Sequence, residues 1–201
     1  MEPLRRHDGI AVPLRRANVD TDAIAPMRFL VSPDRQGLGR ALFANWRAED
    51  PDFPLNRARW AGASVLVAGA NFGCGSSREM AVWALAEAGF RVIIAPSFGE
   101  IFAINCFKNG LLAIALPEAA VEALQDALEK GAGQSRMSVD LEANLLVGPD
   151  GASYGFVVDP ARRAALLEGL DEIGLTLKRE ADIAAFQAAD RLRRPWVYET
   201  G

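Results

Sequence analysis

The side chains best suited to chemistry lie in one glycine-rich segment, residues 71–79, which reads Asn-Phe-Gly-Cys-Gly-Ser-Ser-Arg-Glu. A guanidinium such as that of Arg78 can bind a carboxylate or phosphate through two parallel hydrogen bonds. A hydroxyl such as that of Ser76 can move a proton where nearby dipoles and cations stabilise its anion. The segment therefore predicts capture of a carboxylate or phosphate beside a serine that takes part in proton transfer.

Two elements must position this segment. An apolar run over residues 64–68 predicts a buried strand before it, and residues 80–86 predict a helix after it. The unpaired N–H groups and the positive dipole end at the start of that helix attract anions. On the local pattern alone, an ordinary tight turn is the alternative interpretation.

Two other phosphate-binding loops do not fit. A dinucleotide-binding turn needs a third glycine where this chain has Arg78, and it needs an acidic residue near the end of the next strand. That strand, predicted over residues 91–95, ends in Pro96 and Ser97. A Walker-type loop needs the residues Gly-Lys-Ser/Thr after the turn, and these residues are absent after the turn in this chain.

The rest of the chain predicts one α/β domain over residues 1–201. Continuous apolar strands that alternate with helical patterns are typical of βαβ units and a parallel sheet. The predicted fold is a mainly parallel sheet with flanking helices and a β-rich, helical C-terminal part whose strands are antiparallel. We expect strands near residues 10–14, 64–68, 91–95, 111–116, 138–141, 145–147 and 154–158, helices near 39–48, 80–86, 98–109, 118–130, 160–168 and 178–192, and a surface loop over 49–59.

Composition excludes several classes of function. The chain has 201 residues and a net charge of −4 with scattered basic residues, so we expect no nucleic-acid binding. It has no apolar run long enough to span a membrane and no signal-peptide pattern, so we expect a cytoplasmic protein. His7 is expected in a solvated tail, and Cys74 and Cys106 form neither a disulfide framework nor a metal motif. We therefore expect no metal site here, and any metal cluster must be carried by another chain.

Several motifs, in their order along the chain, resemble the swivelling domain of the aconitase superfamily. They are residues 18–26, 71–79, 97–102 and 105–112. Further motifs narrow the resemblance to the small-subunit family of bacterial 3-isopropylmalate dehydratases. These are residues 28–30, 37–39, 42–43, 46–47 and 169–177.

The resemblance implies a β/β/α swivelling fold that closes over a large subunit in a heterodimer or heterotetramer. It implies that the large subunit holds a [4Fe–4S] cluster, one iron of which acts as a Lewis acid on a small dicarboxylic hydroxy acid. The implied reaction isomerises 2-isopropylmalate and 3-isopropylmalate through isopropylmaleate in leucine biosynthesis. By the same resemblance, Ser76 is the base that removes the carbon-bound proton, and Arg78, Ser77, Gly75 and Arg28 bind substrate.

Two residues depart from the pattern of the family. Met80 replaces a histidine that usually follows Ser-Ser-Arg-Glu, and Ala113 replaces a proline. In the first helical turn, Met80 either changes the preferred substrate or fills a packing gap. Three functions stay open: the 3-isopropylmalate enzyme, a related subunit for a dimethylmalate-, methylmalate- or homoaconitate-type diacid, and a non-catalytic regulatory subunit that only binds an anion.

Three neighbouring features also have two interpretations. Ser77 either donates to the substrate carboxylate or caps the helix. Glu79 is expected to be a first-turn helix residue or the partner of Arg78. Residues 20–22 are expected to form an Asx-type turn beside the site rather than a set of metal ligands.

Overall fold

The central sheet is mixed. The computed structural model of the chain describes residues 1–29, 37–131 and 135–198, and within them the sheet has the strand order β4-β3-β2-β1-β5-β6-β7. The strands are β1 (Arg6–Leu14), β2 (Val65–Ala68), β3 (Val92–Ala95), β4 (Leu112–Ala115), β5 (Arg136–Asp140), β6 (Leu145–Val147) and β7 (Ser153–Gly155). Strands β1 to β4 are parallel, whereas β5, β6 and β7 join through antiparallel pairs. The predicted change from parallel to antiparallel pairing is confirmed.

Strand β1 joins the two halves of the sheet. Residues 11–14 pair in parallel with β2, and residues 6–10 pair antiparallel with β5. The sequence predicted only residues 10–14, because the first half of the strand lacks the apolar pattern of a buried strand. His7 lies in this polar half, where it is half-buried and its Nε2 is 2.8 Å from the Ser64 Oγ. The expectation that His7 lies in a solvated tail is therefore wrong.

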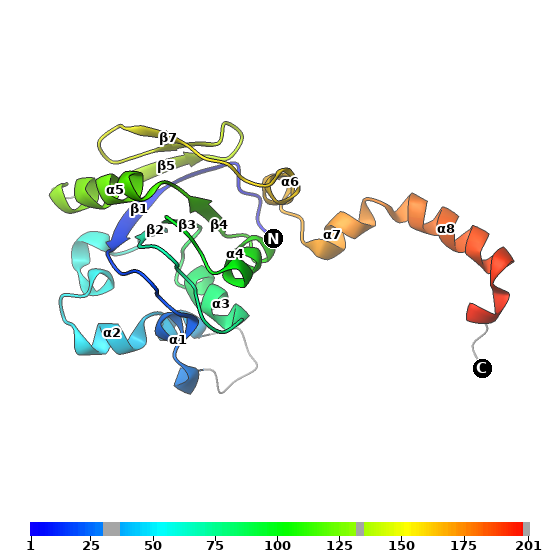
Figure 1. Cartoon of the computed structure of the whole chain (residues 1–201), viewed down its shortest axis with the longest axis horizontal. Helices are drawn as coiled ribbons and strands as arrows, with labels where there is room; N and C mark the ends of the chain where they lie inside the picture. The colour runs from blue at the N-terminus through cyan, green and yellow to red at the C-terminus, as the bar shows by residue number, and fades with distance from the viewer. Residues whose placement is uncertain (30–36, 132–134, 199–201) are drawn as a thin grey trace.

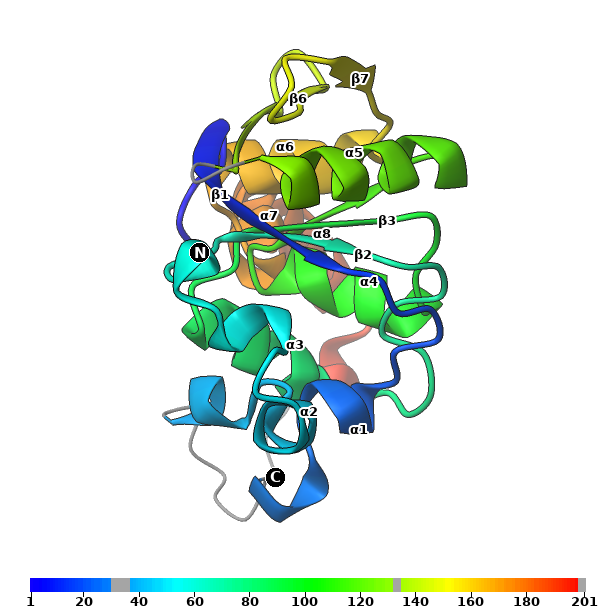
Figure 2. The same ribbon diagram turned by 90° about the vertical axis from the view of Figure 1, so that its left-hand side faces the viewer.

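Helices cover both faces of the sheet (Figure 2). On one face lie α1 (Thr21–Ile24), α2 (Ala44–Glu49), α3 (Glu79–Glu87) and α4 (Glu100–Lys108). On the other face lie α5 (Glu118–Lys130) and α6 (Pro160–Glu168). Two further helices, α7 (Glu172–Leu177) and α8 (Glu180–Arg193), run away from this body toward the C-terminus (Figure 1).

Each face of the parallel strands buries its own hydrophobic core. In β2, Leu66 and Ala68 belong to the core that contains α3 and α4 side chains, whereas Val65 and Val67 belong to the core that contains α5 side chains. Side chains of a strand alternate between faces, and both faces are covered, so these strands appear in the sequence as continuous apolar runs. The glycine-rich segment therefore leaves a strand that is buried along its whole length.

The segment 38–60 differs from the predicted helix and surface loop. A short 3-10 helix, Leu38–Ala41, is separated from α2 by Phe43, whose backbone is left-handed with φ 50°. The buried Phe43 ring stacks on Trp46 with 5.5 Å between ring centroids, and the buried Phe53 ring packs beside both. The prediction failed because this aromatic cluster, rather than a continuous helix, fills the edge of the core.

The C-terminal helices agree with the prediction in part. Asp159 caps α6 by accepting hydrogen bonds from the N–H groups of Ala161 and Arg162, as the Asp-Pro pair predicts. The predicted helix 178–192 corresponds to α8, but α7 before it was not predicted, because six residues are too few for a clear helical period. No helix among the described residues is long and apolar enough to cross a membrane.

Candidate active site

The glycine-rich segment forms a loop between β2 and α3, and the chain near Val19 runs alongside it. The Gly73 N–H donates to the Val19 carbonyl at 2.7 Å, and the Thr21 N–H donates to the Cys74 carbonyl at 3.0 Å. These are backbone bonds, so they fix the path of the loop and leave its side chains available.

The other side of the loop packs against the start of α4. The Phe72 N–H donates to the Ser97 carbonyl at 3.0 Å, and the Gly99 N–H donates to the Phe72 carbonyl at 2.9 Å. Gly73 has φ +74°, and a Cβ atom there would lie 2.1 Å from the Phe102 ring. Glycine is therefore required at position 73 by both backbone conformation and close packing.

Gly75 and Ser76 are exposed on this loop. Gly75 has φ +85°, a conformation that a side chain would strain. The Ser76 carbonyl accepts hydrogen bonds from Thr21 Oγ1 at 2.9 Å and from the Arg78 N–H at 2.7 Å. The Ser76 hydroxyl has no hydrogen-bond partner among the described residues, so the backbone is held while the hydroxyl stays available to a ligand.

Arg78 forms an ion pair with Asp22, which lies on α1. The Arg78 side chain is 21% exposed and that of Asp22 is 53% exposed. Only Nη1 of Arg78 makes this contact, so within the described part of the chain the rest of the guanidinium can receive a carboxylate. Glu79 is the first residue of α3, which confirms one of its two interpretations. It is not the partner of Arg78, because its carboxylate accepts a hydrogen bond from Asn109 Nδ2 at 2.9 Å.

Helix α3 begins immediately after Arg78, which occupies the N-cap position. No side chain caps this helix, so Ser77 does not have the capping role that was one of its two interpretations. The uncapped N–H groups and the helix dipole favour an anion in front of the first turn. The predicted arrangement of a loop hydroxyl, an arginine and a helix N-terminus is present.

Residues 20–22 form the N-cap and first residues of helix α1 rather than the separate Asx-type turn that was predicted. Asp20 caps α1, with its Oδ1 accepting from the Ala23 N–H at 2.7 Å. Among the described residues, no three His, Cys, Asp or Glu side chains could share a metal ion. Both cysteines are free, and burial raises the pKa of the Cys106 thiol well above its ordinary value, which makes that thiol inert.

Arg28 is not joined to the loop by any hydrogen bond or ion pair within the residues that the structure describes. It is exposed on a short 3-10 helix, with its guanidinium 4.8 Å from the Phe29 ring centroid. The following residues 30–36, which include the last residue of the motif 28–30, lie outside the described residues. Met80 is partly buried in the first turn of α3, at the predicted position.

Asn109 is a candidate site residue that the sequence did not single out. Its Nδ2 donates to Glu79, and its Oδ1 accepts from Trp83 Nε1 at 3.0 Å. Both partners lie on α3, so Asn109 at the end of α4 fixes the start of the helix beside Arg78. Residues 79 and 109 are 30 positions apart, so local spacing carried no signal of this contact.

Comparison with known proteins identifies the family. The aconitase C-terminal domain model matches residues 1–119, and the model for the C-terminal domain of the 3-isopropylmalate dehydratase small subunit matches residues 172–200. A 3-isopropylmalate dehydratase small subunit from Cupriavidus necator is 52% identical over 208 residues, which cover 100% of both chains. The chain belongs to the 3-isopropylmalate dehydratase small-subunit family.

Other members of this family agree with the assignment. The small subunit from Methylibium petroleiphilum is 50% identical over 214 residues, covering 100% of this chain and 99% of the relative. A crystal structure of 3-isopropylmalate dehydratase from Methanocaldococcus jannaschii has a TM-score of 0.67 and 27% identity, covering 90% of this chain and 98% of that chain. The predicted fold class and the predicted family are both confirmed.

Proposed function

We propose that this chain is the small subunit of a two-subunit hydro-lyase that isomerises 2-isopropylmalate and 3-isopropylmalate through isopropylmaleate in leucine biosynthesis. The observation that carries the proposal is the 52% identity, over the full chain, to a 3-isopropylmalate dehydratase small subunit. The loop of residues 71–79, which is held by backbone hydrogen bonds and carries the exposed Ser76 and the half-buried Arg78, supports the proposal. The proposed location is the cytoplasm, where the free thiols of Cys74 and Cys106 stay reduced.

Ser76 has the proposed role of base. It removes the proton from the substrate carbon and returns it in the hydration half-reaction. A serine hydroxyl is a poor base in water, so its anion must be stabilised by dipoles or cations. The start of α3 and the Arg78 guanidinium follow Ser76 within three residues and supply both.

Arg78 has the proposed role of binding a substrate carboxylate. Its contact with Asp22 orients the guanidinium and leaves donors for a bidentate contact. Ser77 and the backbone of Gly75 lie next to it on the same exposed stretch and add donors to the same carboxylate. Arg28 is proposed to bind the substrate from the neighbouring 3-10 helix.

A large subunit must complete this site, because the loop is exposed and offers groups from one side only. The described residues do not fit a metal cluster, so the proposed [4Fe–4S] cluster belongs to the large subunit. When bound there, the cluster supplies a Lewis acid. This chain's own tasks are to cover the substrate, hold a carboxylate and move one proton, and excluding water strengthens each charged contact.

Met80 supports a second candidate substrate. It replaces the usual histidine in the first turn of α3 and is only partly buried beside the loop. A thioether in place of a polar ring removes a hydrogen-bonding group, and the second candidate is therefore a related 2-hydroxy diacid of the dimethylmalate, methylmalate or homoaconitate type. The alternative is that Met80 only fills a packing gap. The chemistry of Ser76 and Arg78 is the same for either substrate.

The test is reconstitution with a substrate panel. The isolated chain should be colourless and inactive, and addition of the large subunit should give turnover, with 2-isopropylmalate having the highest kcat/KM. Stoichiometric iron and sulfide with turnover in the isolated chain would contradict the two-subunit proposal. A higher kcat/KM for another diacid would replace the first substrate with the second candidate.

A further inference from the structure

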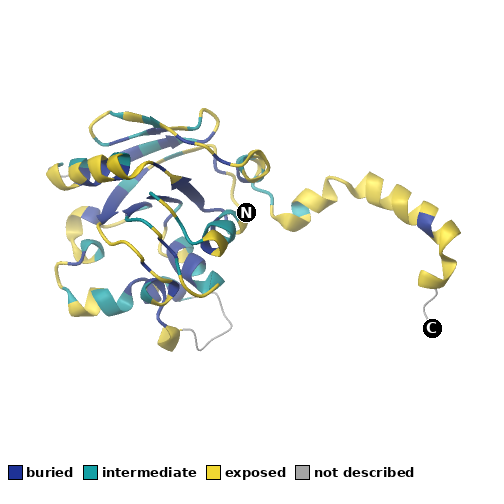
Figure 3. Cartoon of the chain, in the orientation of Figure 1, coloured by how far each residue is buried: buried dark blue, intermediate teal, exposed yellow. Residues whose placement is uncertain are grey.

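The C-terminal arm, residues 172–198, packs on little of its own body (Figure 3). From Leu175 to Val197 every residue is exposed except Asp190. That carboxylate is covered by the arm itself, since it accepts hydrogen bonds from Arg194 Nε at 2.8 Å and from the Tyr198 hydroxyl at 2.9 Å. The outer part of the arm is therefore ordered by contacts within the arm alone.

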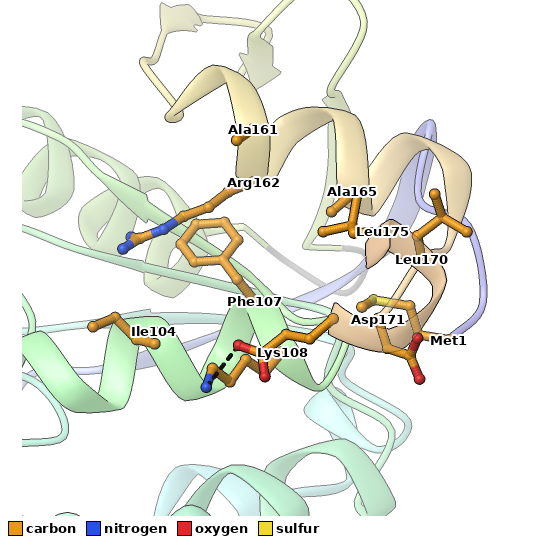
Figure 4. Close-up of a pocket in the computed structure, with 11 residues that line it drawn as sticks. Met1, Ile104, Phe107, Lys108, Ala161, Arg162, Ala165, Leu170, Asp171 and Leu175 are labelled. Carbon is orange, nitrogen blue, oxygen red and sulfur yellow. Dashed lines mark ion pairs between the residues drawn. The ribbon is translucent and has the colours of Figure 1, made fainter. Parts of the chain in front are cut away.

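Among the described residues, the arm contacts the body only near the start of the arm. There an apolar cavity of about 290 Å³ lies between α4, α6 and α7, and Figure 4 shows Phe107 and Leu175 at its wall. Lys108 Nζ pairs with Glu172 at 2.9 Å, and Lys178 pairs with Glu168. Among the described residues, no hydrogen bond or ion pair joins α8 to the loop of residues 71–79.

Helix α8 requires a partner for physical reasons. It has 14 residues, and isolated helices of about this length are marginal in water. The arm also exposes large apolar side chains: Leu192 is 87% exposed, Trp196 is 67% exposed and Phe186 is 63% exposed. Large exposed apolar groups that recur along one segment mark an interaction surface rather than a solvated one.

Two observations indicate which partner covers the arm. The model for the C-terminal domain of the small subunit matches residues 172–200, whereas the aconitase C-terminal domain match ends at residue 119. The arm thus has a sequence pattern typical of small subunits, although it makes few contacts with the body of its own chain. Its 27 described residues also suffice for one side of a standard interface, which takes about 20–30 residues per partner.

We propose that the C-terminal arm is the docking element for the large subunit, with the existence of that partner resting on the proposed function. Leu192 and Trp196 enter an apolar groove of the large subunit. Arg191 and Arg193 lie beside Leu192, so the rim of this groove carries carboxylates. The arm sets the strength of subunit assembly, and the loop of residues 71–79 sets the chemical step.

The test compares two apolar-to-acidic substitutions of equally exposed residues in the full-length chain. Leu192→Asp changes the arm, and Val157→Asp changes a residue on the body that is 91% exposed. The Kd for the large subunit is measured by sedimentation, and kcat is measured at saturating small subunit. Leu192→Asp should raise the Kd at least tenfold and leave kcat unchanged, and Trp196→Ser should act in the same direction. Val157→Asp should match the wild type in both quantities.

Several outcomes would overturn this assignment. Wild-type Kd values for both arm variants would show that the arm does not dock. The arm would instead bind a second copy of this chain if three results held together. The wild-type chain would form a dimer on its own, Leu192→Asp would dissociate that dimer, and the Kd for the large subunit would stay unchanged. If the arm variants formed active complexes with the same Kd for the large subunit as the wild type, only the docking proposal would be overturned. Arm-dependent assembly without isomerase turnover would support docking and overturn only the proposed function.

Discussion

The loop of residues 71–79 and the arm of residues 172–198 are both exposed, yet the chain holds them in different ways. The loop has backbone hydrogen bonds to Val19 and Ser97, and Gly73 packs against the Phe102 ring. Beyond Lys178, the arm has hydrogen bonds and ion pairs only within itself in the described part of the chain. A group that moves a proton must be held in position by a rigid scaffold in its own chain. A docking element needs no such scaffold, because its apolar side chains pack against the partner.

The largest effect on stability is expected from a methyl group inside the loop. Gly73→Ala places a Cβ in the Phe102 ring at a left-handed φ, which should cost on the order of 3 kcal/mol of unfolding free energy. Gly174→Ala in α7 is the matched change in the arm, and it should alter stability by less than about 1 kcal/mol. Urea unfolding measures both. Equal losses for the two variants would break the comparison.

A smaller effect is expected from Arg78→Lys in the reconstituted complex. Lysine keeps the positive charge but lacks the planar guanidinium, which can bind a carboxylate through two parallel hydrogen bonds. In the wild type the same guanidinium also pairs with Asp22. We expect kcat/KM to fall at least tenfold, about 1.4 kcal/mol, while the Kd for the large subunit stays unchanged. Steady-state kinetics and sedimentation separate the two quantities. A wild-type kcat/KM would remove Arg78 from the site.

Asp190→Asn in the arm is expected to have the smallest effect on the stability of the body. The Arg194 guanidinium, followed by the Tyr198 hydroxyl, lowers the pKa of Asp190 below its ordinary value of 3.8. A carboxylate with a lowered pKa stabilises the folded form above its unfolded pKa, and this contribution is lost as pH falls through the folded pKa. Asp190→Asn should therefore speed amide exchange in α8 at pH 7, and the difference from wild type should shrink as pH falls below 3.8.

The control for Asp190→Asn is the body of the same molecule. Amide exchange in β2 and β3 should be identical in the variant and the wild type, because Asp190 bonds only to Arg194 and Tyr198 within the described residues. Parallel loss of protection in β2 would mean that the arm supports the body, and the two regions would no longer be independent.

The parts of the fold that the sequence predicted are those with local signals. The apolar runs of β2, β3 and β4 predicted parallel strands because both of their faces are buried. The Gly-Ser-Ser-Arg order predicted the loop and its place before a helix. The broken helix around Phe43 could not be predicted, because the aromatic contacts that break it come from α2 and from residue 53.

The parts of the site that the sequence missed depend on distant contacts. Asp22 and Arg78 are 56 positions apart, and they meet because the start of α1 lies beside the glycine-rich loop. Asn109 contacts α3 because α4 ends beside the start of that helix. Helix α8 of the arm was predicted, but its exposure was not, since a pattern of apolar residues does not say which molecule will cover it.

The central claim is that Ser76 moves the carbon-bound proton, and Ser76→Ala tests it most directly. The Ser76 hydroxyl has no partner in the described structure, so its loss should leave folding, assembly and the partner's cluster intact. In the assembled complex, turnover and exchange of the substrate carbon-bound proton with deuterated solvent should both fall on the order of a hundredfold or more. Wild-type exchange and turnover in a fully assembled Ser76→Ala complex would make Ser76 a turn residue and place the base elsewhere.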